Sequence, residues 1–119
     1  MNPSNLKELA EQIAVPAPHL RYILEQIKIY IPEAIVWVFG SRVKGGHRPA
    51  SDLDLAIICD KETAKNALPK LNEVFIESDL TFKVQLLDFN RLPENMQANI
   101  IKKYVVLYQP KRKDNVRSD

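Results

Sequence analysis

The chain has 119 residues, enough for one compact domain with its own core and too few for two domains of ordinary size. Its 45% apolar and 27% charged residues are typical of a globular protein and exclude a disordered or fibrous chain. A net charge of +2 is too small to indicate a nucleic-acid or membrane partner, and the single cysteine, Cys59, excludes an intramolecular disulfide.

Two helices are predicted at the start of the chain, followed by a strand. Ser4 is expected to cap an amphipathic helix that residues 15–18 bring to an end, and a second helix is expected from Pro18 to Pro32. Residues 35–39, Ile-Val-Trp-Val-Phe, are an uninterrupted apolar run that predicts a strand buried on both faces. The second helix is expected to face the core with Leu20, Ile23, Leu24, Ile27 and Ile31.

In the rest of the chain, predicted strands alternate with predicted helices. The polar residues 41–50 predict a short helical turn and a loop, strands are predicted at 52–58, 82–87 and 104–108, and helices at 61–76 and 93–103. This order indicates an α/β or α+β domain, which we expect to span residues 1–110, with 111–119 as a flexible basic tail. Because neither a membrane span nor an export signal is evident, we expect a cytoplasmic location.

Two carboxylates begin the second predicted strand. Asp52 and Asp54 are two residues apart, so their side chains are expected to project from the same face of the strand. Neighbouring carboxylates repel each other unless a cation lies between them, and hard oxygen ligands suit Mg²⁺ or Mn²⁺. The pair therefore predicts a metal site with catalytic aspartates.

A second pattern precedes the aspartates by ten residues. Gly40-Ser41 lies where a predicted strand ends and a turn begins, a place where backbone N–H groups can hold phosphate oxygens. Arg42 and Lys44 add positive charge to the same turn. Either pattern alone is compatible with an ordinary turn or an exposed strand end. Their conjunction favours a nucleotide site, in which the turn grips the outer phosphates and metals bound by Asp52 and Asp54 polarise the α-phosphate.

The residues that carry these patterns resemble a known family, the minimal nucleotidyltransferases (MNT) of the DNA polymerase β superfamily. The similarity runs through residues 38–45 and 51–57 and extends to 77–80, 83–88 and 104–106. The resemblance implies an α+β fold with a mixed sheet of about four strands flanked by helices. It also implies that Gly40 and Ser41 hold a triphosphate and that Asp52 and Asp54 bind the metals.

Members of that family are commonly antitoxins paired with a small helical HEPN ribonuclease toxin. They transfer AMP from ATP to a tyrosine hydroxyl of the toxin and so block its RNase activity. The resemblance therefore implies Mg²⁺, ATP and a HEPN-type toxin as the cofactor, substrate and partner of this chain. No membrane partner and no direct nucleic-acid binding are expected.

One position departs from the family pattern. Active members usually carry a third acidic residue on the strand predicted here at 82–87, and Gln85 corresponds to that position. An amide can coordinate a metal weakly but cannot act as a base. Asp88 is the nearest acid, but three residues along a strand it faces the opposite way. Three functions stay open: an active adenylyltransferase antitoxin, an impaired relative that neutralises its toxin by binding only, and transfer to a small molecule such as an aminoglycoside.

Overall fold

The computed structural model describes the backbone of residues 3–110 and the side chains of residues 6–110. The tail predicted at 111–119 lies outside the described residues. Within the described part of the chain, no helix is long and apolar enough to cross a membrane. The elements are α1 (Pro3–Gln12), α2 (Ala17–Tyr30), β1 (Ile35–Phe39), α3 (Ser41–Lys44), β2 (Leu53–Ile58), α4 (Lys61–Asn66), α5 (Leu68–Ile76), β3 (Val84–Asp88), the 3₁₀ turn η1 (Phe89–Arg91), α6 (Glu94–Lys102) and β4 (Val105–Tyr108).

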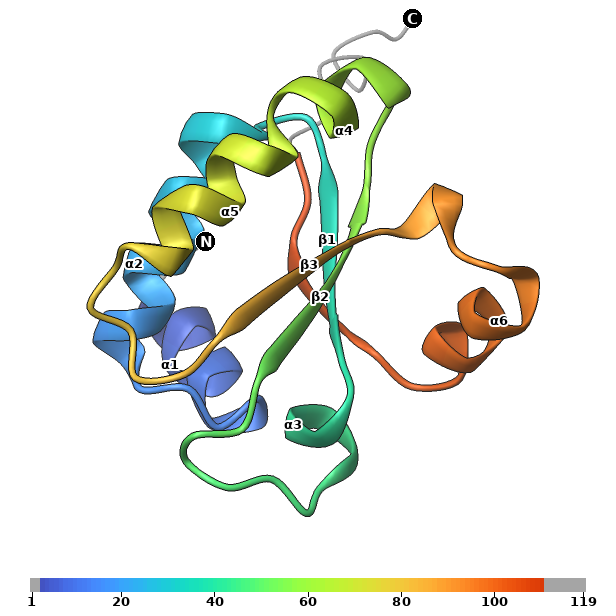
Figure 1. Ribbon diagram of the computed structural model, residues 1–119. Helices are drawn as coiled ribbons and strands as arrows, with labels where there is room; N and C mark the ends of the chain where they lie inside the picture. The colour runs from blue at the N-terminus through green and yellow to red at the C-terminus, as the bar shows by residue number, and fades with distance from the viewer. Residues whose placement is uncertain (1–2, 111–119) are drawn as a thin grey trace, which may run out of the picture.

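The strands form one mixed sheet in the order β3-β2-β1-β4. β1 pairs antiparallel with β2 and β4, whereas β2 and β3 run parallel and are joined by a crossover through α4 and α5. Helices α1, α2, α4 and α5 cover one face, and α6 lies on the other side of the sheet (Figure 1). The predicted α+β fold with a four-stranded mixed sheet is confirmed.

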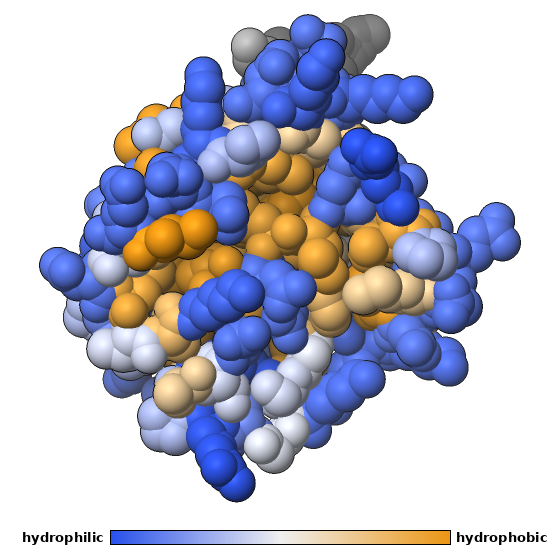
Figure 2. All heavy atoms as spheres, in the orientation of Figure 1, coloured by the Kyte–Doolittle hydropathy of each residue, from blue (hydrophilic) through white to orange (hydrophobic). Residues whose placement is uncertain are grey.

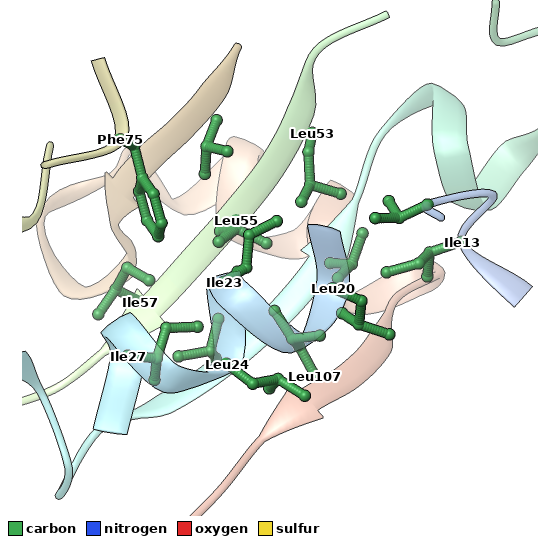
Figure 3. Close-up of a cluster of buried hydrophobic side chains, with 14 of the residues drawn as sticks. Ile13, Leu20, Ile23, Leu24, Ile27, Leu53, Leu55, Ile57, Phe75 and Leu107 are labelled. Atoms are coloured by element: carbon green, nitrogen blue, oxygen red, sulfur yellow. The ribbon is translucent and has the colours of Figure 1, made fainter. Parts of the chain in front are cut away.

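The core lies between the sheet and the helices α1, α2 and α5. Helix α2 turns an apolar stripe with helical spacing toward β2, whose alternate residues face the stripe (Figure 3). The predicted inward residues of this helix are all buried, including Ile31 just after its end. The β2 partners in this layer are fully buried as well: Leu53, Leu55 and Ile57.

β1 differs from the prediction that both of its faces are buried. Val36 and Val38 are fully buried against the helices, whereas Ile35, Trp37 and Phe39 on the other face are only half-buried. That face lacks a complete helical layer, and apolar side chains stay visible between α5 and α6 (Figure 2). Aromatic side chains partly cover it: Tyr104 stacks on Trp37 with 4.0 Å between ring centroids, and Phe89 meets the same indole edge-on at 5.4 Å.

The single helix predicted at 61–76 is two helices that meet at Ala67. Pro69 explains the break, because proline has no N–H and its ring clashes with the carbonyl group four residues earlier. In the first turn of α5 the missing N–H costs nothing. Asp60 starts α4 as its cap, with its carboxylate accepting a 2.8 Å hydrogen bond from the Thr63 N–H.

Ser4 was predicted to cap the first helix from the position before it. Helix α1 begins at Pro3 instead, so Ser4 lies within its first turn. Its other end closes in a Schellman motif, in which the Val15 N–H bonds the Ala10 carbonyl at 3.0 Å and the Ala14 N–H bonds the Glu11 carbonyl at 3.3 Å. Ala14 takes the left-handed position, with a φ of 56°, that glycine usually occupies. The carbonyl group of Ala14 is therefore aimed by an unusual backbone conformation.

Candidate active site

Gly40 directly follows β1 and packs against Asp54 of β2. Its φ of 86° and ψ of −157° belong to a region of backbone space that essentially only glycine adopts. A Cβ atom placed on Gly40 would overlap the Asp54 carboxylate, with its Oδ2 as the nearest atom. The pairing of Phe39 with Asp54 across β1 and β2 sets this approach. The glycine of the Gly-Ser pattern thus serves both the sharp turn and the close contact with an aspartate.

Gly40→Ala is expected to destabilise the protein by about 2–4 kcal/mol and to weaken nucleotide binding, because backbone strain adds to the displacement of Asp54. Gly46→Ala is the matched control, since Gly46 has a similar φ of 80° but open space around its Cβ position. Urea unfolding and titration with Mg²⁺-ATP of both variants measure the two effects. Equal nucleotide affinity in the two variants would show that the contact with Asp54 has no role in binding.

Ser41 opens α3, a single helical turn. The first N–H groups of a helix have no partner inside it, and in α3 they belong to Ser41 and Arg42. The turn itself is closed by hydrogen bonds from the Val43 and Lys44 N–H groups to the Gly40 carbonyl, at 3.0 and 2.9 Å. Lys44 is exposed at the end of this turn. The turn can therefore offer backbone N–H groups, one hydroxyl and one ammonium to a phosphate chain.

The two aspartates lie together at the head of β2. Asp52 is exposed and immediately precedes the strand, while Asp54 is half-buried within it. Burial raises the pKa of the Asp54 carboxyl, and repulsion from Asp52 raises that pKa further, whereas the nearby Lys83 ammonium lowers it. An ionised Asp54 is thus disfavoured by its surroundings until positive charge arrives. The pair fits the hard divalent cation Mg²⁺ or Mn²⁺, which proteins often hold with one or two carboxylates and substrate phosphates.

Gln85 lies beside Asp54 on the neighbouring strand. The parallel register pairs Asp54 with Gln85 and Ile57 with Asp88, so Gln85 shares the face of Asp54 and Asp88 does not. Within residues 6–110, no group of three acidic, histidine or cysteine side chains is placed to hold a metal ion. The protein itself brings two carboxylates and one neutral amide to this face of the sheet.

Arg42, which was predicted to add positive charge to the phosphate-binding turn, is almost completely buried in the structure. Only 3% of its surface is exposed, and its guanidinium lies 4.6 Å over the Phe82 ring. All three guanidinium nitrogens donate to backbone carbonyl groups: Nη1 to Ala14 at 2.5 Å, Nη2 to Pro49 and Ser51 at 2.8 Å each, and Nε to Ser51 at 3.2 Å. Arg42 therefore holds the loop after α3 in place, and Lys44 is left as the exposed cation of the turn.

The loop between α3 and β2 ends in a tight turn. The Ser51 hydroxyl accepts a 2.7 Å hydrogen bond from the Arg48 N–H, and the Ser51 N–H donates to the Arg48 carbonyl at 2.9 Å. With Arg42 bound to the Ser51 carbonyl as well, this turn fixes the approach of the chain to Asp52. The residues between Gly40 and the aspartates thus form a loop that is held in place by its own hydrogen bonds.

A groove of about 220 Å³, here called the α6 groove, adjoins the Gly40 turn. The sequence did not reveal it, because α6 is remote from the Gly-Ser pattern along the chain. A larger hollow of about 310 Å³ opens between α2 and residues 77–80 and contains none of the predicted site residues. The α6 groove is lined by Phe39, Gly40, Lys44, Met96, Asn99, Ile100 and Lys103.

A mixed four-stranded sheet with a Gly-Ser turn at the end of one strand and two aspartates at the head of its antiparallel neighbour defines a nucleotidyltransferase of the polymerase β type. The model of that family, described as polymerase beta, nucleotidyltransferase, matches residues 24–113. The probable protein adenylyltransferase MntA of Haemophilus influenzae is 40% identical over 103 residues, which cover 87% of this chain and 84% of that protein. The chain belongs to the polymerase β nucleotidyltransferases and, among them, to the family of MntA.

Two solved structures share the fold at low sequence identity. A toxin–antitoxin crystal structure with AMP-PNP has a TM-score of 0.59 and 20% identity, and the match covers 82% of this chain and 78% of that one. The MntA–HepT toxin–antitoxin structure has a TM-score of 0.52 and 17% identity, with 85% and 79% covered. The resemblance to the minimal nucleotidyltransferases is confirmed, and these two likenesses support the fold.

Proposed function

We propose that this protein is a protein adenylyltransferase antitoxin, which transfers AMP from ATP to a tyrosine hydroxyl of a HEPN ribonuclease toxin and thereby neutralises the toxin. The 40% identity with a probable protein adenylyltransferase over most of both chains carries the proposal. The toxin–antitoxin assemblies with the same fold, one of them with AMP-PNP, agree with it. Residues 1–110 would act as the single catalytic unit.

In the proposed reaction the tyrosine hydroxyl loses its proton to solvent and its oxygen attacks the α-phosphorus of ATP, while the bond between that phosphorus and the oxygen bridging to the β-phosphorus breaks and pyrophosphate leaves. Gly40, Ser41 and Lys44 would bind the outer phosphates. Asp52 and Asp54 would hold Mg²⁺, which supplies charge stabilisation at the α-phosphate when bound. Arg42 would act on this step only through the loop that it supports.

Incubation of the purified protein with radiolabelled ATP, Mg²⁺ and its partner toxin tests the proposal. The expected result is label on the toxin, a mass gain of AMP at a tyrosine, and loss of RNase activity that requires ATP. Transfer of AMP to a small molecule, or use of GTP in place of ATP as the donor, with no label on the toxin, would contradict the proposal.

Gln85 favours a second candidate, in which the fold neutralises the toxin by binding alone, since an amide beside Asp54 cannot take up a proton. Toxin inhibition without ATP would establish that candidate. The two functions are separated by a toxin activity assay with and without ATP, because binding alone needs no nucleotide.

Gln85→Asp is expected to raise both Mg²⁺ affinity and the rate of AMP transfer, by about tenfold, because it adds a third carboxylate next to Asp54. In the absence of metal the same change should lower the thermal midpoint through added repulsion. Thr81→Asp, which adds equal charge at an exposed position before β3, serves as the control for charge alone. An unchanged rate together with unchanged Mg²⁺ affinity would show that Gln85 does not occupy the third ligand position.

A further inference from the structure

The α6 groove and the candidate phosphate site share one wall. That wall is Gly40, which lines the groove together with residues of α6 and packs against the Asp54 carboxylate. Phe39 pairs with Asp54 across β1 and β2, so the two side chains lie on the same face of the sheet. Directly opposed residues on such strands have their Cβ atoms about 5 Å apart. A group attached to a phosphate held near Asp54 would therefore reach the groove without crossing the protein.

The residues that line the groove suit a ligand with both apolar and polar groups. Its walls are apolar where Phe39 ends β1 and where Met96 and Ile100 face it from α6. Asn99, which is exposed on α6, contributes a side-chain amide to the lining. Three of its α6 residues follow helical spacing, at 96, 99 and 100, so a single face of the helix supplies this wall. Apolar walls with one well-placed polar group are typical of small-molecule pockets.

The size and charge of the groove narrow the choice of occupant. Its volume of about 220 Å³ is below the roughly 300–1,000 Å³ of pockets that enclose a whole drug-sized ligand. It therefore suits one part of a nucleotide. Lys44 and Lys103 also line it, so positive charge continues from the turn at Gly40 into the groove. A neutral ring with a phosphate chain leading toward Gly40 matches this distribution of charge.

We propose that the α6 groove binds the nucleoside part of the donor nucleotide, and that Asn99 selects adenine. A side-chain amide matches the edge of adenine, where it can donate to N7 and accept from the N6 amino group, whereas guanine presents acceptors at both positions. Phe39, Met96 and Ile100 supply the apolar walls for the base and sugar. This proposal rests on the proposed function, because it takes the Gly40 turn as the phosphate site.

The test compares three ligands in calorimetric titrations of the full chain in the presence of Mg²⁺: ATP, GTP and inorganic tripolyphosphate. Tripolyphosphate reports on the phosphate site alone. Asn99→Ala removes the amide that is proposed to select adenine. Met96→Trp places a larger side chain in the groove, at a position that is partly exposed to solvent. Asn95→Ala is the matched control, since Asn95 is an exposed asparagine of the same helix that does not line the groove.

We expect Asn99→Ala to weaken ATP binding about tenfold and to remove the preference for ATP over GTP, with tripolyphosphate binding unchanged. Met96→Trp should weaken both nucleotides and spare tripolyphosphate, and Asn95→Ala should behave as the unmodified protein. If tripolyphosphate binds but both groove variants bind ATP normally, the groove proposal is overturned while the proposed function stands. An equal loss of ATP and tripolyphosphate in Asn99→Ala also overturns it. If neither ligand binds the unmodified protein, the proposed function itself fails.

Discussion

Asp54→Asn is expected to reduce AMP transfer by at least about 10³-fold while the protein stays folded. Metal-borne charge stabilisation at a phosphoryl group is worth several kcal/mol, and about 4 kcal/mol corresponds to a factor of 10³ in rate. The double variant Asp52→Asn with Asp54→Asn should also lose measurable binding of Mg²⁺-ATP. Initial rates of AMP transfer and calorimetry with Mg²⁺-ATP measure the two effects.

Asp79→Asn is the control for the loss of one carboxylate, because Asp79 is exposed in the loop that leads to β3. Retained Mg²⁺-ATP affinity in the double variant would disprove the assignment of the metal site. Such a result would also leave toxin binding as the remaining function of the fold.

The single variant Asp54→Asn should be more stable than the unmodified protein when no metal is present. Because the folded state raises the pKa of Asp54, its ionised form destabilises the fold at neutral pH. The gain from Asp54→Asn should stay below about 1 kcal/mol, since the side chain is only half-buried and water screens its charge. It should disappear on acidification below the ordinary carboxyl pKa, where Asp54 is protonated in both folded and unfolded chains. Thermal unfolding at several pH values, without divalent ions, measures the difference.

Arg42→Ala is expected to lower the free energy of unfolding by about 3 kcal/mol, a large part of the stability of a small domain. The change leaves the carbonyl groups of Ala14, Pro49 and Ser51 without their charged donor and removes the contact with Phe82. Urea unfolding measures the loss. Arg42→Lys should recover only part of it, because an ammonium lacks the planar fork that reaches several acceptors at once.

Arg48→Ala provides the matched control, since Arg48 is an exposed arginine of the same loop. It should change stability by less than about 0.5 kcal/mol. If Arg42→Ala kept its stability but bound ATP more weakly, Arg42 would have to be assigned to phosphate binding, as the sequence predicted.

The parts of the site that could be predicted are those in which neighbours in the sequence are also neighbours in space. Asp52 and Asp54 lie on one strand, and the Gly40 turn is joined to that strand by a single loop, so the local pattern contains their geometry. The mixed sheet followed from the resemblance, and the buried stripe of α2 from spacing alone. The opposite orientations of Gln85 and Asp88 followed from the period of two in a strand, and the place of Gln85 beside Asp54 from the resemblance.

Other parts depend on tertiary contacts that leave no local pattern. The acceptors of Arg42 are backbone carbonyl groups, one of them 28 residues away, and any residue type can supply a carbonyl. The open face of β1 depends on how much of the sheet α6 covers, which the composition of β1 does not reveal. The α6 groove joins two segments remote in the chain. In contrast, the break at Ala67 had a local signal in Pro69, which the helical apolar pattern obscured.

The bond between Arg42 and the Ala14 carbonyl bears on where a minimal working unit can be cut. Similarity to the family model starts at residue 24, and a fragment trimmed to that boundary would lack α1, the first half of α2 and the acceptor at Ala14. Its Arg42 guanidinium would keep the carbonyl groups of Pro49 and Ser51 but lose that of Ala14, and the sheet would lose part of its helical cover. A shortened protein made for expression or crystallisation should therefore retain α1, although this helix lies outside the residues that match the family model.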